Sequence, residues 1–284
     1  MARTLRASHL SALRYHLPRL AAAAIFVVPL IWVVSFSLRQ PGLPPPRSIE
    51  WLPTPVMWNN YAKIFDLVPL ATYLGNSMLV VAIAVPVTLL TASLAAFAIA
   101  RSSRRFRERM VLFCVLLMLV PATALWLTRF VLYVKLGLID TVWSLVATAI
   151  MGSSPLFVLL YLWSFRRIPP EQFDAARVDG ATFLGLWHHV AMPQARPATV
   201  TVTVLAFIFY WSDFFSPLLY LKSEENYTLP VALQLMQQMD KTNWPLLMAG
   251  AVFMTTPVVI VFLALQRYFW PDDSKGEREA LVTE

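Results

Sequence analysis

Two glycines in the middle of the chain have a spacing that could belong to a nucleotide site. Gly180 and Gly185 are separated as in a phosphate-binding loop, where a Lys and a Ser or Thr follow the second glycine and contact the phosphates and the metal ion. Here Leu186 and Trp187 follow instead. Neither side chain can replace the lysine or the hydroxyl, so the sequence predicts no nucleotide hydrolysis by this chain.

Side chains that could bind a metal or transfer a proton are few. His188 and His189 are adjacent, so on a helix they diverge by about 100° and cannot hold one metal ion well. Asp213 is the only acid inside a long apolar stretch. An ionised group costs roughly 2.5–3.5 kcal/mol at the bilayer centre, so Asp213 is expected to face a bundle interior or a wet cavity. No metal site is predicted.

The elements that position these residues are apolar and long. Of the residues, 58% are hydrophobic and only 14% are charged, which indicates a membrane protein. A bilayer core needs about twenty mostly apolar residues per helix. Six stretches qualify: 20–38, 73–100, 110–127, 143–163, 200–221 and 246–265. The predicted fold is an all-α membrane protein with six transmembrane helices, in which the internal prolines mark kinks.

The basic residues predict the orientation of these helices, because Lys and Arg concentrate in cytoplasmic loops. Of the 23 Lys and Arg residues, 16 lie in the N-terminus, the loops after the second and fourth stretches, and the C-terminal tail. We therefore expect both termini to be cytoplasmic. The predicted divisions are a cytoplasmic N-terminus (1–19), a transmembrane domain (20–265) and a cytoplasmic tail (266–284). The domain includes an external strap (39–72) with a short amphipathic helix, a cytoplasmic loop (164–199) and an external loop (222–245).

The cytoplasmic loop 164–199 predicts two short helices. Pro169 and Pro170 suit a helix start, where a missing backbone N–H costs nothing. Gly180 is placed to end this helix in a left-handed turn. Thr182 can cap a second helix that stops near Pro193. We refer to these two helices, residues 169–193, as the knob.

The knob resembles the EAA loop of the integral-membrane permease subunits of binding-protein-dependent ATP-driven (ABC) importers. Asp174 stands where Glu is usual in the Glu-Ala-Ala triplet, so the negative charge is kept. Gly180 follows at the family's spacing, and Met192-Pro193 forms the later hydrophobic-Pro pair. The resemblance implies a coupling helix that docks on an ATPase, with its contacts at Phe173, Asp174, Ala175, Ala176, Arg177 and Gly180. We expect the face of Phe173 and Ala176 to insert into the ATPase; alternatively, Asp174 only stabilises the helix near its N-terminus.

A narrower likeness covers about residues 19–269. The chain is similar to the six-helix partner of a heterodimeric permease in the carbohydrate-uptake, maltose-type branch. The matches are Asn60-Tyr61, Asn76-Ser77, Leu136-Gly-Leu138 with Thr141, Trp211-Ser-Asp-Phe214 with Pro217, Tyr227-Thr-Leu-Pro230, and Gln266-Arg-Tyr-Phe269. The family's Gly-Ala-Val-Lys-Gly-like tail is replaced by a charged tail, so no ATPase contact is assigned to it.

The resemblance also implies the partners and the location. These are a second permease subunit, a homodimeric cytoplasmic ATPase that binds ATP and Mg, an external solute-binding protein and membrane lipids, with no nucleic acid. The chain itself would bind no cofactor and would not be an enzyme. The location would be the bacterial plasma (inner) membrane, with the chain crossing it several times.

The resemblance points to two further groups of residues. The external loop would contact the binding protein through Tyr227, Thr228, Leu229 and Pro230. The substrate path would include Asn76, Tyr210, Trp211 and Asp213. For Asp213 the alternative is a structural hydrogen bond, and for the two aromatic side chains it is an interfacial belt. For Asn76 the same two interpretations apply, and the structural one is favoured.

The most favoured function is import of a sugar or oligosaccharide by alternating access, powered by a partner ATPase. One alternative is that the same machinery imports a polyol or a glycerophosphate-type solute. A basic translocation path would favour this cargo, and Arg129 is the only residue that points to one. A membrane-embedded transferase is a weaker alternative, because it would need a cluster of acids or histidines at the interface.

Overall fold

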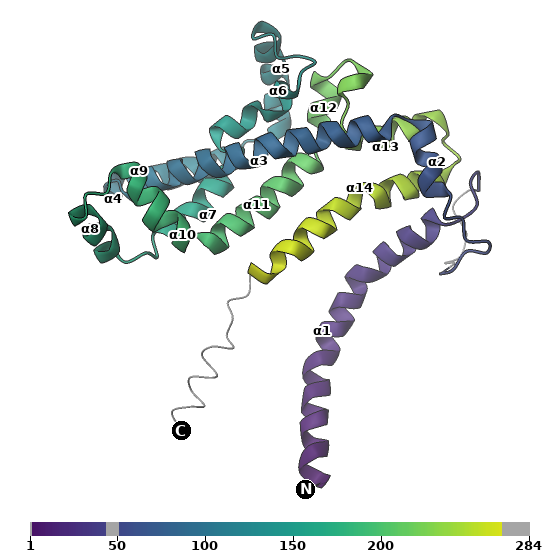
Figure 1. The fold of residues 1–284 in the computed structure, drawn as a ribbon, viewed down its shortest axis with the longest axis horizontal. Helices are drawn as coiled ribbons and strands as arrows, with labels where there is room; N and C mark the ends of the chain where they lie inside the picture. Colours follow the sequence, from purple (N-terminus) through teal and green to yellow (C-terminus); the bar gives the residue numbers. More distant parts are fainter. Residues whose placement is uncertain (1, 44–50, 269–284) are drawn as a thin grey trace. The chain divides into compact units, whose positions relative to one another are not determined.

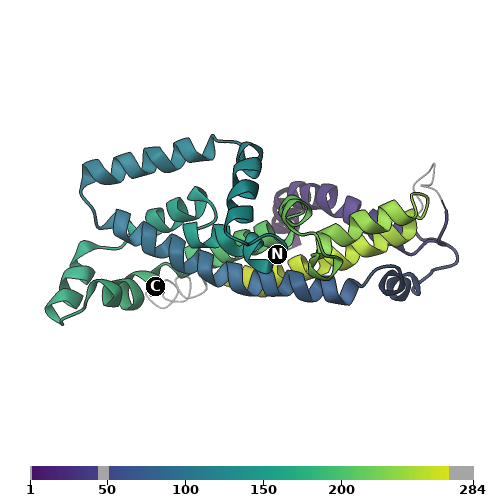
Figure 2. The ribbon, with the colours of Figure 1, turned by 90° about the horizontal axis from the view of Figure 1, so that it is seen from above.

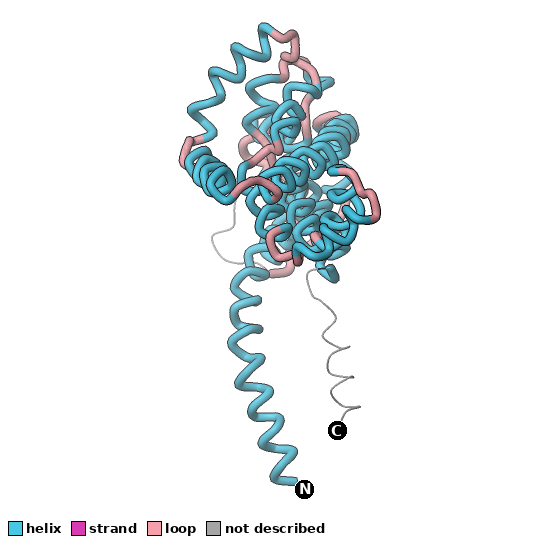
Figure 3. Tube along the Cα trace, turned by 90° about the vertical axis from the view of Figure 1, so that its left-hand side faces the viewer, coloured by secondary structure: helices cyan, strands magenta, loops and turns pink. Residues whose placement is uncertain are grey.

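The computed structural model describes residues 2–43 and 51–268, and within these ranges all regular structure is helical, as Figure 3 shows. The described chain forms two compact units, Met1–Leu70 with Leu233–Thr255 and Ala71–Ala232 with Thr256–Glu284. Part of the predicted strap (44–50) and most of the predicted tail (269–284) lie outside the described residues. The prediction of an all-α protein is confirmed for the described part of the chain.

The first unit contains the first predicted span and the predicted external helix. Helix α1 (Ala2–Ser37) includes a stretch, Leu17–Ser37, that is long and apolar enough to cross a membrane. Helix α2 (Asn60–Leu67) follows the strap, close to the predicted position. The buried amide of Asn60 donates hydrogen bonds to the carbonyl oxygens of Ser37 (2.8 Å) and Arg39 (2.7 Å). The first bond satisfies a carbonyl group that the end of α1 leaves unpaired, and the second binds the residue that follows.

The second unit is built around α3 (Leu70–Ala100), which is long enough to cross a membrane. Helix α7 (Pro155–Phe165) packs against α4 (Arg104–Met118) and α11 (Arg196–Trp211). The remaining elements before the knob are η1 (Ala122–Leu125), α5 (Trp126–Lys135), α6 (Val142–Val146) and η2 (Ala147–Met151). After α11 come α12 (Phe215–Tyr220), η4 (Glu224–Asn226), α13 (Leu229–Met239), α14 (Trp244–Leu265) and η5 (Gln266–Tyr268). Of these, α13 from residue 233 and α14 up to residue 255 belong to the first unit.

The third predicted span is not one continuous helix. Helix α4 ends at Met118, and the chain bends by 88° before the next helical segment, Ala122–Lys135 (Figure 2). Pro121 explains the break, because a proline lacks the backbone N–H that would continue the helix and disfavours helical geometry in the residue before it. The prolines of α1, α3 and α14, in contrast, lie inside continuous helices.

The fourth and fifth predicted spans are also interrupted. Between η2 and α7, Gly152 and Ser153 have positive φ angles of 77° and 59°. Pro155 therefore begins α7 instead of kinking it, and the Oγ of Ser154 accepts the N–H of Leu156 at its start. Helix α11 ends at Trp211, and three residues separate it from α12.

The described residues contain four helices that could span a membrane, or five if the bent pair is one span. The four are Leu17–Ser37, Leu70–Ala100, Val142–Phe165 and Trp244–Leu265. Helix α11 is apolar, but it has only 16 residues. Each of the six predicted stretches thus has an apolar helical counterpart, while the count of six spans stays a prediction.

Candidate functional site

The first helix of the knob has the predicted beginning and end. Helix α8 (Pro170–Val178) starts with Pro170 in its first turn. Gly180 has φ +83°, its N–H donates to the carbonyl of Arg177 (2.9 Å), and the N–H of Ala181 donates to the carbonyl of Ala176 (2.9 Å). These two bonds form a Schellman motif, in which a glycine adopts the left-handed conformation at no steric cost. The predicted turn at Gly180 is confirmed.

The second helix of the knob has the predicted cap. The Oγ1 of Thr182 accepts the N–H of Gly185 at 3.2 Å and begins α9 (Phe183–Gly185). A π-helical segment, η3 (Leu186–Ala191), and α10 (Met192–Gln194) follow. The helical run therefore ends one residue after Pro193, as predicted. Figure 1 shows α8, α9 and α10 together at the end of α3 from which α4 begins.

An aromatic cluster attaches the knob to the apolar helices. Phe97, near the end of α3, is fully buried. Its ring centroid lies 5.8 Å from that of Phe165 on α7, 6.1 Å from Phe173 on α8 and 4.9 Å from Phe183 on α9. The guanidinium of Arg101 lies 4.6 Å from the centroid of the Phe173 ring. Both helices of the knob are therefore packed on α3, which a sequence pattern could not specify.

This cluster includes part of the predicted docking face. Phe173 is only 2% exposed and Ala176 is half-buried, so in this structure the Phe173 ring faces its own chain. The reason is local, because a phenyl ring beside Phe97 removes apolar surface from water without any partner. A nine-residue helix shows an apolar face in its sequence, but the sequence does not show what covers that face.

The outer surface of the knob carries the other predicted residues. Asp174, Ala175 and Arg177 are exposed, and the guanidinium of Arg177 lies 3.1 Å from the carboxylate of Asp174. An exposed pair of this kind adds little to stability, so both charges are available to a partner. The knob also exposes two apolar side chains, Val178 on α8 (89% exposed) and Leu184 on α9 (60% exposed). The knob thus presents a mixed polar and apolar surface.

The aromatic residues of the predicted path are buried. Tyr210 is 6% exposed, and its hydroxyl lies 2.5 Å from that of Ser153 and 3.2 Å from that of Thr148. The hydroxyl of Ser153 also lies 2.5 Å from that of Thr88 on α3. Sequence reasoning missed this network, because isolated Ser and Thr residues in apolar spans carry no signal of their partners.

Trp211 is also packed inside the chain. It is 1% exposed and stacks on Phe207, with the ring centroids 5.4 Å apart. Both Tyr210 and Trp211 are thus covered by the chain itself in this structure, and their place on a substrate path or in an interfacial belt stays a prediction.

Asp213 lies in the break between α11 and α12. It is half-buried, and its Oδ1 accepts the N–H of Ser216 at 3.1 Å in the first turn of α12. This bond caps the helix locally; it resembles the structural alternative, but its partner is in the same segment and not on a neighbouring helix. A break in an apolar helix is tolerated only where protein or water covers the backbone. Asp213 therefore marks a point where a wet path is compatible with the fold.

Asn76 and Asp140 hold the segment 222–228, which was predicted to be external. The amide of Asn76 on α3 donates to the carbonyl oxygens of Glu225 (2.7 Å) and Tyr227 (2.9 Å). The carboxylate of Asp140, which has φ 62°, accepts the N–H groups of Lys222 (2.9 Å) and Ser223 (3.0 Å). It also accepts the Ser223 hydroxyl.

These contacts define the role of both residues in the structure. The hydrogen bonds from Ser223, followed by those from Lys222 and Asn226, lower the pKa of the Asp140 carboxyl below its usual range. The structural role that the sequence favoured for Asn76 agrees with its two hydrogen bonds. Asp140 was not predicted; an Asp in a turn after a glycine is common, and only the folded chain brings it to residue 223.

The residues predicted to contact a binding protein are mostly covered. Thr228, Leu229 and Pro230 are buried, and Tyr227 is half-buried. Leu229 begins helix α13, and its N–H donates to the hydroxyl of Ser77 at 2.8 Å. These residues anchor the segment 222–228 within the chain, and their contact with a binding protein stays a prediction. The exposed part of the same segment is residues 222–226.

Among the described residues, no group of three or more His, Cys, Asp or Glu side chains gathers that could hold a metal ion. His188 and His189 are exposed on the knob, and the Nδ1 of His189 lies 3.2 Å from the carbonyl of Gly185.

Comparison with known proteins gives consistent matches over most of the chain. Residues 84–272 match the family of binding-protein-dependent transport system inner membrane components. The arabinooligosaccharides transport system permease protein AraQ of Halalkalibacterium halodurans is 30% identical, over 87% of this chain and 89% of its own length. The melibiose/raffinose/stachyose import permease protein MelC of Bacillus subtilis is 26% identical, over 92% of this chain and 94% of its own.

A solved structure shares the fold. It belongs to a bacterial ABC transporter involved in the import of the acidic polysaccharide alginate. The likeness covers 93% of this chain and 98% of that chain, with a TM-score of 0.73 and 23% sequence identity.

Proposed function

Because this chain belongs to the family of binding-protein-dependent transport system inner membrane components, we propose that it is the permease subunit of an ATP-driven importer for an oligosaccharide. The relatives named above transport arabino-oligosaccharides and the melibiose, raffinose and stachyose group. Their similarity extends over nearly the whole chain, which supports a sugar cargo. The chain would translocate this cargo by alternating access, a two-state change of the helices.

We place the chain in the membrane with six spans, both termini in the cytoplasm and residues 222–226 outside. Support comes from the distribution of Lys and Arg and from the apolar helices that match the six predicted stretches. In this arrangement the bent pair of α4 and α5 is one span, and α11 with α12 is another. The break at residues 119–121 is exposed in this chain, so in this arrangement the second permease subunit or water would cover its unpaired backbone groups.

The knob is the part that would receive force from the ATPase. The main support is that the inner face of the knob packs on α3 and α7 through Phe97, while its outer face is exposed at Asp174 and Arg177. A displacement of the outer face would move α3 and α7 with it, because packed aromatic side chains do not deform continuously. The partner would be a homodimeric ATPase that binds ATP and Mg, and this chain would hold neither.

Two further partners complete the proposed machine. A second permease subunit would close the path, since one bundle of six helices is too small to enclose an oligosaccharide. An external solute-binding protein would deliver the cargo and would meet the exposed residues 222–226, not the buried residues 228–230. The half-buried Asp213, at the break between α11 and α12, is the side chain we propose for the path.

Cysteine labelling in intact cells tests the orientation of the knob. Val178→Cys places a thiol on its exposed outer face, and Glu225→Cys places one in the external segment. A membrane-impermeant maleimide should label Glu225→Cys from outside and should leave Val178→Cys unlabelled until the membrane is opened. The natural Cys114 is buried and serves as the common background. External labelling of Val178→Cys would refute the coupling role.

Uptake by proteoliposomes tests the cargo. The permease pair, the ATPase and the binding protein would be reconstituted and offered labelled raffinose, an arabino-oligosaccharide, a polyol and glycerol phosphate. ATP-dependent uptake of an oligosaccharide is expected. Uptake restricted to the polyol or to glycerol phosphate would support the alternative cargo and would leave the coupling proposal intact.

A further inference from the structure

An open groove of about 570 Å³ lies at the beginning of α4, beside the end of α7. Its lining changes in character along α4. Arg104, Arg107 and Glu108 line the first turns of the helix, Arg166 comes from the residue after α7, and Val111, Leu112 and Val115 line the following turns. We refer to this site as the arginine groove.

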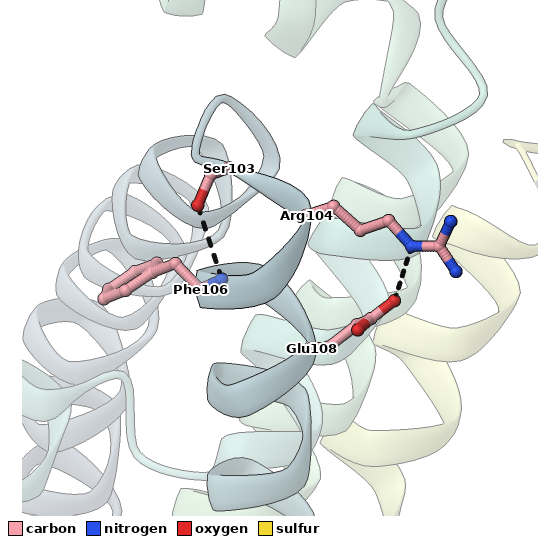
Figure 4. Close-up of polar contacts among 4 residues, drawn as sticks. All are labelled: Ser103, Arg104, Phe106 and Glu108. Carbon is pink, nitrogen blue, oxygen red and sulfur yellow. Dashed lines mark hydrogen bonds and ion pairs between the residues drawn. The ribbon is translucent and has the colours of Figure 1, made fainter.

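The residues of α4 lie on one face because they are three or four positions apart. Figure 4 shows how the sequence starts this helix at the right place: the Oγ of Ser103 accepts the N–H of Phe106 at 3.4 Å, so Arg104 begins the first turn. The charged end and the apolar end of the groove therefore follow directly from the order of residues in α4.

The charges of the arginine groove do not cancel. Arg104 donates to the carboxylate of Glu108 at 2.8 Å (Figure 4), and that pair is exposed. Arg107 and Arg166 also lie near enough to Glu108 for their charges to act on it. Arg107 gives one N–H to the carbonyl of Ala100 (3.3 Å) and keeps further donors, since a guanidinium has five. Because Arg104 already pairs with Glu108, the positive charges of Arg107 and Arg166 are not neutralised within the groove.

The apolar end of the arginine groove is open as well. Leu112 is 59% exposed and Val115 is 43% exposed, although both lie in a helix of the membrane domain. A soluble anion would satisfy the arginines and leave these side chains uncovered. A peptide of another subunit would need an acidic side chain opposite the two guanidinium groups, followed by a continuous strip of apolar side chains. An amphiphile with an anionic head and hydrocarbon chains fits both ends at once.

We propose that the arginine groove binds an anionic phospholipid, with its phosphate between Arg107 and Arg166 and an acyl chain along Val111, Leu112 and Val115. A guanidinium suits this role because its planar donors match phosphate oxygens. The depth is also suitable, because basic pockets at the cytoplasmic ends of membrane helices lie at the level of the headgroups. The proposal does not depend on the identity of the cargo.

The position of this lipid relates it to the knob. Arg107 and Arg166 also line a second cavity of about 240 Å³, together with Arg101 and Phe173. A phosphate between the two arginines would hold the start of α4 and the end of α7 together, directly behind the aromatic cluster. Binding should therefore favour the arrangement in which the knob is packed on α3.

Spin-labelled lipids test the proposal on the complete complex. The association of phosphatidylglycerol would be measured against that of phosphatidylcholine, from the motionally restricted signal of each. Arg107→Gln with Arg166→Gln should lower the selectivity for phosphatidylglycerol roughly fivefold for each guanidinium removed and about thirtyfold for both. Arg107→Lys with Arg166→Lys keeps the charge and should retain most of it.

A matched control and two alternative occupants make the test decisive. Arg105 is exposed on the same helix but does not line the groove, so Arg105→Gln should leave the selectivity unchanged. Equal losses in Arg105→Gln and in the double variant would overturn the site. Displacement of the lipid by soluble glycerol phosphate would show an anion site instead. A cross-link from Leu112→Cys to another subunit would show that protein covers the groove.

Discussion

Replacing Gly180 with valine should uncouple the knob from transport. Gly180 has φ +83°, and a Cβ built on it meets no atom within 4 Å. The cost of a side chain is therefore purely conformational. The left-handed region costs an L-residue roughly 1–2 kcal/mol, and a β-branched residue up to about 3 kcal/mol.

The alternative open to the variant is to give up the turn. That would break the bonds from Gly180 to Arg177 and from Ala181 to Ala176, both 2.9 Å, at about 0.5–1.5 kcal/mol each. The two costs are comparable, so valine should lower the population of the closed turn by roughly one order of magnitude or more. Asparagine tolerates the left-handed region and would lose less, so Gly180→Asn serves as the graded variant.

Sugar uptake and ATPase stimulation by the loaded binding protein would be measured in proteoliposomes. Both should fall in the order Gly, Asn, Ala, Val, while the amount of chain in the membrane stays constant. Gly137 is the matched control, because it has φ +67° and its Cβ would likewise meet no atom within 4 Å. It lies in the turn after α5, away from the knob, so Gly137→Val should retain coupling.

Wild-type uptake and ATPase stimulation in Gly180→Val would refute the reasoning, because the strain would then have no consequence for the force-bearing element. Equal loss in Gly137→Val would refute it differently. It would show that general destabilisation, and not the geometry of the knob, decides transport.

Phe173→Ala should abolish ATPase stimulation and Phe173→Leu should preserve most of it, since removing a buried phenyl costs about 3–5 kcal/mol; full stimulation in Phe173→Ala would contradict the aromatic attachment. Asp213→Asn should lower initial uptake rates while leaving the fold intact, because its amide oxygen can still accept the N–H of Ser216 but the charge on the proposed path is lost; wild-type uptake would show that Asp213 has only a structural role. Hydrogen bonds from Ser223 lower the pKa of Asp140, so its hold on the external segment is complete above about pH 3.9 and disappears only as pH falls through the lowered value. Limited proteolysis should show that the segment 222–228 of the wild type is still protected at about pH 3.9. In Asp140→Asn this protection should be lost already at neutral pH.

Much of the fold follows from local order in the sequence. The all-helical class, the position of α2, the start of α8 at Pro170 and the turn at Gly180 were all predictable. Each depends on hydrophobic length or on the backbone restrictions of one or two residues, and both are visible in a single sequence. The interruption at Pro121 could have been predicted for the same reason, but proline is tolerated in most membrane helices, and its effect depends on the neighbours.

The sites were less predictable because they depend on what covers each side chain. Phe173, Trp211 and Leu229 are the clearest cases: their residue types suggested exposed contacts, and all three are buried within the chain. Asp140 and Ser153 carried no signal at all, since their partners are more than fifty residues away in sequence.

Composition and the order of neighbouring residues are enough to make the chain helical and apolar, to predict an orientation from its arginines, and to set where the knob begins, turns and is capped. No distant contact is needed for these properties. Long-range packing, in contrast, selects which face of the knob is free, which hydroxyl groups meet inside the bundle and where two arginines stand over an apolar wall. Those features arise when residues distant in the sequence compete for the same buried space, and a single sequence does not show which of them will occupy it.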